Sequence, residues 1–218
     1  MNNTSCKLCS KPVNTISDDS IKYYYCSKCG FICKDEGFIV APDKEKNRYM
    51  THNNAPDNEG YVSMLNEFID KTVRYAGSGH MHALDYGCGN NPVLAMLLRK
   101  RGYTVDTYDK YFAPDKTYRT RKYDIITLTE VIEHIEYPIK TFNELNALIN
   151  PDGIISIMTL FHPENTEEFK TWWYKRDFTH ISFYSGKTLE YVAGTMDMNI
   201  AFIDKKNTCV FKKRNSFL

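Results

Sequence analysis

The sequence lacks a long apolar run, an internal repeat and an excess of charge of either sign. Its longest uncharged apolar stretch, residues 153–161, has the length of a strand, whereas a membrane-spanning helix needs about 20 residues. The first ten residues carry no apolar segment of the kind found in secretion signals. With 28 basic and 27 acidic side chains, the net charge of +1 disfavours bulk attraction to duplex nucleic acid. We therefore expect a soluble cytoplasmic protein that does not contact a membrane.

Cysteine is concentrated near the N-terminus, where four of the seven cysteines form two CxxC pairs. Sixteen residues separate the pairs, a spacing typical of a tetrahedral zinc site rather than of a disulfide framework. Four thiolates leave no open coordination position, so the zinc would be structural. Reduced free cysteines or a redox CxxC pair are the alternatives, and Cys33 is a substitute ligand. The predicted zinc ligands are Cys6, Cys9, Cys26 and Cys29.

After this ribbon, apolar residues predict helices and strands in alternation. Residues 41–58 are polar with two prolines and indicate a linker, whereas apolar residues at helical spacing over 59–76 predict a covering helix. Apolar strands that alternate with helices are typical of a mostly parallel sheet covered on both faces. The expected strands are 82–86, 104–108, 123–128, 154–159, 200–204 and 208–212, and the expected helices between them are 92–101, 141–149 and 185–198.

The predicted fold class is therefore α/β, with a Rossmann-like sheet preceded by a small zinc ribbon. The ribbon occupies residues 1–40, the linker and covering helix occupy 41–78, and the sheet domain occupies 79–218.

The first strand of this domain runs into a glycine turn within the segment LDYGCGNNP. Gly87 and Gly89 permit a tight turn and close approach of the backbone to a ligand. Asp109 ends the next strand, the position at which an acid binds the hydroxyls of a ribose. The third glycine of the dinucleotide fingerprint is replaced by proline, which disfavours NAD, and Asp85 suits a ligand that carries an amine or a sulfonium. These features indicate an adenosine-containing ligand, with a purely structural turn as the alternative.

The glycine turn, the Asp109 strand end and the segment YDIITLTEVIEHI resemble the successive motifs of class I S-adenosylmethionine-dependent methyltransferases. The CxxC pairs and the segments 49–61 and 172–185 extend the resemblance to an uncharacterised bacterial family of such enzymes with an N-terminal ribbon. The resemblance implies the class I methyltransferase fold and S-adenosylmethionine as cofactor, but no substrate. It implies cofactor contacts from Asp85, Gly87, Cys88, Gly89, Asp109, Thr129 and Glu130.

One segment departs from that family. Only fourteen residues separate Asp109 from Asp124, where the usual core has a helix, a strand and another helix. We expect this strand to be short or missing, and the 49–61 segment to cover the cofactor instead, with Tyr49 or His52 in contact.

Two groups of residues carry candidate chemistry. If the EVIEH segment is helical, Glu130, Glu133 and His134 share one face at the ligand-binding edge of the sheet. His134 is then a general base, or the three residues bind Mg²⁺ that acidifies a substrate hydroxyl, with a capping and surface role as the alternative. The same pattern is similar to that of the small-RNA 2′-O-methyltransferases and the ubiquinone-pathway O-methyltransferases, which implies a metal.

The second group lies in residues 161–184, an aromatic and charged insert between the expected strand 154–159 and the next helix. An insert of this length at the ligand edge indicates a substrate lid. Within it, Asp177 orients His180 as a base or supplies a further metal ligand; the alternative is that the aromatic residues only pack over the sheet. The predicted catalytic residues are His134, His180, Glu133 and Asp177.

The sequence thus favours a methyltransferase that acts on a hydroxyl of a small-molecule or glycan-type substrate. The alternative is a zinc-ribbon protein that binds or modifies RNA, with Tyr23, Tyr24 and Tyr25 stacking on bases. An NAD-linked oxidoreductase is a third, disfavoured hypothesis.

Overall fold

The computed structural model describes residues 4–18, 21–52, 54–79 and 81–214. Its larger part is a six-stranded sheet, made of β4 (His82–Tyr86), β5 (Thr104–Tyr108), β6 (Tyr123–Thr129), β7 (Ile149–Met158), β9 (Met198–Ile203) and β10 (Thr208–Lys213). The strand order is β5-β4-β6-β7-β10-β9. The first four strands are parallel to one another, and β10 is antiparallel to both of its neighbours.

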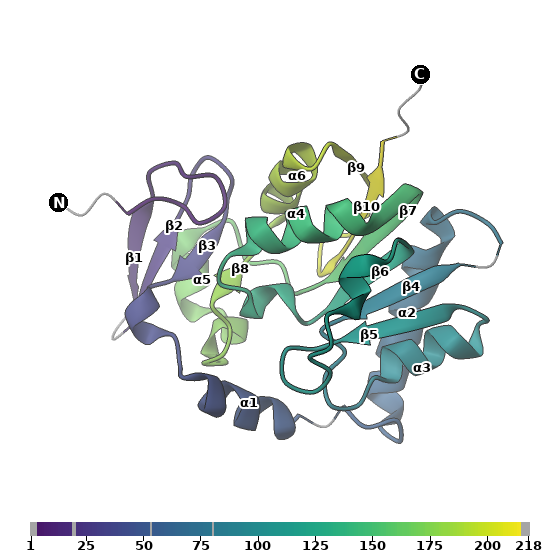
Figure 1. Cartoon of the computed structure of the whole chain (residues 1–218). Coiled ribbons are helices and arrows are strands. Elements are labelled where there is room, and N and C mark those ends of the chain that lie inside the picture. Colours follow the sequence, from purple (N-terminus) through teal and green to yellow (C-terminus); the bar gives the residue numbers. More distant parts are fainter. Residues whose placement is uncertain (1–3, 19–20, 53, 80, 215–218) are drawn as a thin grey trace.

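Helices cover both faces of this sheet, as Figure 1 shows. They are α2 (Glu59–Thr72) and α3 (Val93–Lys100) on one face, and α4 (Pro138–Leu148) and α6 (Gly186–Thr195) on the other. Consecutive strand residues point to opposite faces, so Ile125 packs with α2 and α3 while Ile126 packs with α4 and α6. Full burial of each such side chain stabilises the fold by about 1.5–3 kcal/mol. The predicted α/β fold with helices on both faces is confirmed.

The polar linker contains a helix that the sequence analysis missed. Residues of α1 (Pro42–Met50) include none that is buried, so no apolar stripe marks the helix. Its start is favoured instead by Pro42 at the first turn and by Asp43 and Glu45, whose charges suit a helix N-terminus. None of the helices in the described part of the chain is long and apolar enough to cross a bilayer.

A second, four-stranded antiparallel sheet stands beside the first (Figure 1). Its strands, in order, are β1 (Asn14–Asp18), β2 (Ile21–Tyr25), β3 (Ile32–Lys34) and β8 (Ser182–Phe183). The last of these comes from the 161–184 insert, which also holds α5 (Thr166–Thr171) and a 3₁₀ helix, η5 (Trp173–Arg176). A two-residue strand has no periodicity to reveal it, so nothing in the sequence indicates that the ribbon and the insert share one sheet.

The four predicted zinc ligands come together at the end of this sheet. The Sγ atoms of Cys6 and Cys29 are 3.6 Å apart, and those of Cys9 and Cys26 are 3.4 Å apart. Tetrahedral Zn–S bonds of about 2.3 Å require sulfur atoms about 3.8 Å apart, so the cluster fits a zinc ion. Cys33 lies in β3, outside this group.

Lys34 is buried where β3 meets the insert. Only 2% of the residue is exposed, and its Nζ donates to the carbonyl of Phe178 at 3.0 Å. Burial lowers the pKa of Lys34 from 10.5 to about 8, although the charge of Asp177 acts in the opposite direction. The Lys34 amine therefore binds its proton less tightly in the folded protein than in the unfolded chain.

We expect Cys26→Ser to remove the metal and to unfold the four-stranded sheet, because metal binding contributes on the order of 10 kcal/mol to the folding of such a segment. Zinc content by elemental analysis and thermal unfolding by circular dichroism check this. Cys33→Ser is the matched control and should hold one zinc more per chain than Cys26→Ser; equal zinc in the two variants would show that the cluster is not the metal site.

Lys34→Met should change how stability depends on pH. Because the pKa is about 8 when folded and 10.5 when unfolded, the unfolded chain binds more protons between these values, and the wild type gains stability as pH rises through them. The variant lacks this gain. Its free energy of unfolding relative to wild type should therefore fall by about 3 kcal/mol between pH 7 and pH 10.5, measured by urea titration. A difference that is constant with pH would contradict the burial of a charged Lys34.

Candidate active site

A cavity of about 1220 Å³ opens at the carboxyl ends of β4, β5 and β6, the edge at which parallel α/β sheets bind ligands. All of the residues predicted to bind the cofactor line it: Tyr49, Asp85, Gly87, Cys88, Gly89, Asp109, Thr129 and Glu130. Of the residues predicted to be catalytic, His134 and His180 line the cavity, whereas Glu133 and Asp177 are not among its lining residues.

The glycine turn is held by backbone hydrogen bonds to the neighbouring strand. The amides of Gly87 and Cys88 donate to the carbonyl of Tyr108 at 2.7 and 3.1 Å. Gly87 and Gly89 both have positive φ angles, of 85° and 67°. A Cβ at Gly87 would lie 2.3 Å from a methyl group of Val131, whereas one at Gly89 would meet nothing within 4 Å. Gly87 is therefore required by packing as well as by its backbone, and Gly89 leaves open space beside the cavity.

Two carboxyl groups flank this turn. Asp109 accepts from the amides of Gly89, Tyr111 and Phe112 at 2.8–3.1 Å, which joins the ends of two strands. Asp85 is 1% exposed, and burial raises its pKa to about 7 although Thr127 donates to it at 3.3 Å. A cationic group placed beside Asp85 would recover the electrostatic energy that burial has cost this carboxylate.

The segment between Asp109 and β6 contains no strand, as predicted; its regular element is the 3₁₀ helix η3 (Thr117–Thr120). Helix α1 covers this part of the cavity. The Tyr49 ring lies 5.9 Å from that of Tyr111 and 5.0 Å from that of His134, and Glu45 accepts from the hydroxyls of both tyrosines. Both Tyr49 and His52 line the cavity.

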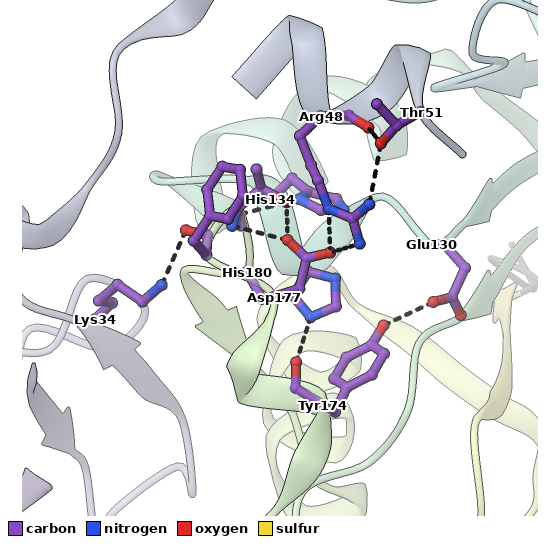
Figure 2. A network of polar contacts seen from close by, with 10 residues as sticks. Lys34, Arg48, Thr51, Glu130, His134, Tyr174, Asp177 and His180 are labelled. Carbon is purple, nitrogen blue, oxygen red and sulfur yellow. Dashed lines mark hydrogen bonds and ion pairs between the residues drawn. The ribbon is translucent and has the colours of Figure 1, made fainter. Parts of the chain in front are cut away.

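Two of the histidines that line the cavity, His134 and His180, are fixed by backbone carbonyls (Figure 2). The Nδ1 atom of His134 is 3.0 Å from the carbonyl oxygen of Thr179, and that of His180 is 2.8 Å from the carbonyl oxygen of Tyr174. A carbonyl only accepts, so each Nδ1 carries a hydrogen and each neutral ring has its lone pair on Nε2. Burial lowers the pKa of both imidazoles, that of His180 to about 4, and so keeps them neutral.

Glu130 and Glu133 meet at the hydroxyl of Tyr174, which is 2.8 Å from an oxygen of Glu130 and also contacts Glu133. A phenol has one hydrogen, so one of these carboxyl groups must supply the second. Glu133 is fully buried, and its burial together with the charge of Glu130 raises its pKa well above the ordinary value. Its other carboxyl oxygen has no hydrogen-bond partner among the described residues.

The expectation that Glu130, Glu133 and His134 share a helix face is wrong. Glu130 has a left-handed backbone (φ 54°), and only Ile132–His134 form a short 3₁₀ helix, η4. The residues whose ligand atoms lie within 4.8 Å of one another are Glu133, His134 and His180. His180 thus takes the place that the expected Mg²⁺ site gave to Glu130, which lies outside η4 and does not belong to this group.

Asp177 does not hydrogen-bond to the His180 ring, contrary to expectation. Its carboxylate accepts from the Arg48 guanidinium at 2.7 and 3.0 Å and from the amide and hydroxyl of Thr179 (Figure 2). Burial opposes ionisation, but the bonds from Thr179 and Arg48 hold the pKa of Asp177 below its ordinary value. Asp177 therefore joins α1 to the insert.

Sequence reasoning missed three residues of the site: Glu45, Arg48 and Tyr174. Glu45 and Arg48 lie in a segment without apolar periodicity. Tyr174 is one of several aromatic residues in the insert, and nothing in the sequence distinguishes it from the others.

Gly87→Ala should destabilise the protein more than Gly89→Ala. Both changes force a side chain into a left-handed backbone, which costs about 1–2 kcal/mol, but only the first also drives a Cβ into Val131. Urea unfolding of the two variants measures the difference. Equal losses would mean that Val131 moves aside without cost.

Comparison with known proteins agrees with this architecture. A family model described as a methyltransferase domain matches residues 61–197. No curated protein matches the sequence. Among solved structures, the Burkholderia thailandensis 1,6-didemethyltoxoflavin-N1-methyltransferase with bound 1,6-didemethyltoxoflavin and S-adenosylhomocysteine is similar. Its TM-score is 0.59 at 10% identity, over 93% of this chain and all of that one.

Two further structures are an O-methyltransferase family 2 protein from Planctomyces limnophilus in complex with apigenin and an O-methyltransferase family protein from Burkholderia thailandensis. Their TM-scores are 0.55 and 0.54 at 12% and 14% identity, over 79% of this chain, which spans 62% and 63% of their lengths. At these identities the similarity shows the fold alone. The family model, however, covers more than half of the sequence, and the chain belongs to the methyltransferase domain family.

Proposed function

We propose that the protein transfers a methyl group from S-adenosylmethionine to a hydroxyl oxygen of a small-molecule or glycan-type substrate. One observation carries the proposal: a single cavity is lined both by the glycine turn with Asp85 and by two neutral imidazoles with free Nε2 lone pairs.

The residues around the glycine turn suit S-adenosylmethionine. Asp85 is a buried carboxyl group that gains from the ammonium group of the methionine part, and Asp109 stands where ribose hydroxyls are bound. Tyr49, Tyr111 and His52 supply a cover from the side where the family's additional strand is missing. When bound, the cofactor supplies a methyl group on a sulfonium.

The residues on the insert side suit activation of a hydroxyl. A hydroxyl oxygen attacks in line with the methyl carbon, the carbon–sulfur bond breaks with its electron pair on sulfur, and the hydroxyl proton must be withdrawn. His134 and His180 hold lone pairs in the cavity, in tautomers that the Thr179 and Tyr174 carbonyls fix. They are the groups that we assign to the acceptor hydroxyl, with Glu133 beside them.

A small acceptor also agrees with the known neighbours, two of which hold small molecules in their solved structures. The RNA hypothesis loses part of its basis, because Tyr23 is fully buried and cannot stack on a base, and the Tyr24 hydroxyl is engaged with Asp35.

We expect calorimetric titration of the zinc-loaded protein to show binding of S-adenosylhomocysteine and none of NAD. Asp85→Asn removes the buried charge and should weaken this binding at least tenfold, about 1.4 kcal/mol. Asp70→Asn, on the exposed side of α2, is the matched control. Unchanged affinity in Asp85→Asn would refute the role of Asp85, and binding of NAD would refute the cofactor class.

The same protein is then screened with a methyl-labelled donor against hydroxyl-bearing small molecules, oligosaccharides and RNA. Label in the first two classes supports the proposed acceptor. Label only in RNA, with a salt-sensitive RNA shift, would bring the RNA-modifying hypothesis forward.

A further inference from the structure

The cluster of Glu133, His134 and His180 has the composition of a transition-metal site. One ligand atom from each residue lies within 4.8 Å of the other two. The residues come from two parts of the chain, η4 and the insert, and a hydrogen bond of 2.8 Å from the Ile181 amide to the Glu133 carbonyl holds the two parts together.

The imidazoles are already oriented as metal-ligating histidines are. Such histidines usually donate their second ring N–H to a carbonyl or carboxylate, which fixes the tautomer and the ring direction. Here the Nδ1 groups of His134 and His180 are held by the carbonyls of Thr179 and Tyr174 (Figure 2), and the ring centroids are 4.8 Å apart. Both lone pairs therefore remain on Nε2.

Glu133 supplies an independent sign of a missing partner. The residue is 0% exposed, and its Oε2 atom has no hydrogen-bond partner among the described residues. A buried polar atom left without a partner costs about 1–3 kcal/mol, so native proteins rarely keep one without a reason. A cation bound between this carboxylate and the two imidazoles would remove that cost.

We propose that a divalent transition-metal ion binds to one carboxylate oxygen of Glu133 and to the Nε2 atoms of His134 and His180. Two imidazoles and one carboxylate are typical ligands of Zn²⁺, Fe²⁺ and related ions, whereas Mg²⁺ prefers oxygen ligands alone. Three protein ligands leave open positions, and both histidines line the cavity. The inference rests on the proposed function, in which those open positions receive the acceptor hydroxyl.

Glu130 is outside this ligand set although it is close. Its carboxyl oxygen is 2.8 Å from the Tyr174 hydroxyl, and the same hydroxyl contacts Glu133. Because Glu133 must be ionised to bind a cation, the hydroxyl donates its one hydrogen to Glu133 and Glu130 supplies the second hydrogen. Glu130 is therefore a positioning residue that holds Tyr174 against the ligand carboxylate.

The test uses the full chain with one equivalent of zinc, which the four thiolates take up first, and Co²⁺ does not displace this zinc readily because thiolates bind zinc more tightly. Co²⁺ is added and its visible absorption is followed. We expect one further ion per chain, with the bands of a low-coordinate nitrogen- and oxygen-bound Co²⁺ and without the thiolate charge-transfer band. Saturation without such bands, or with the thiolate band only, would overturn the proposal.

Variants then identify the ligands. His134→Gln and His180→Gln should each weaken Co²⁺ binding at least tenfold, and Glu133→Gln should do the same, with folding checked by circular dichroism. His52→Gln, which removes another histidine of the same cavity, should bind Co²⁺ as the wild type does. Equal loss in His52→Gln, or full binding in His180→Gln, would overturn the assignment even if one variant fails to fold.

The outcome is separable from that of the proposed function. Co²⁺ binding needs neither cofactor nor acceptor, so a positive titration with no methyl transfer to any hydroxyl would sustain the metal site and refute the acceptor. Methyl transfer to a hydroxyl with no second metal would refute the site and sustain the function.

Discussion

The backbone of Ile181 is the link on which the site depends. Its carbonyl accepts from the amide of Lys34 in β3, and its amide donates to the carbonyl of Glu133 in η4, at 2.9 and 2.8 Å. A single residue of the insert is thus hydrogen-bonded on one side to the N-terminal sheet and on the other to the turn that follows β6. The neighbouring His180 is placed by this pairing, so the arrangement of the cavity depends on the N-terminal segment that carries the four cysteines.

The parts of the fold that sequence predicts well are those with a local physical signal. The strands β4 and β6 are apolar runs, and the glycine turn has positive φ angles that favour glycine. The spacing of the four cysteines is typical of a zinc site. The parts that sequence missed lack such a signal. Helix α1 has no buried residue, and β8 is two residues long and exists only because β3 offers it an edge.

The candidate site divides in the same way. Asp85, Gly87, Gly89 and Asp109 could be identified because they stand at fixed distances from strand ends. The grouping of Glu133 and His134 with His180 could not, because it depends on a left-handed residue at Glu130 and on contacts between segments about 45 residues apart. Asp177 was predicted to belong to the site, but its partner Arg48 was not, because Arg48 lies in a polar helix without an apolar stripe.

Helix α1 has a consequence for the order of events in turnover. It lies over the cavity without burying any residue of its own, and it is attached through Arg48 to Asp177 and through Glu45 to Lys110 and Tyr111. A helix that has no buried residue, and that is held by these polar contacts and by the Tyr49 ring against Tyr111 and His134, opens at a lower free energy than the whole protein unfolds. A nucleoside-sized molecule can then enter and leave the cavity when this one short helix detaches, while the sheet and the histidines stay in place. The rate of exchange is then set by α1, whereas the geometry of the reacting groups is set by the sheet and the insert.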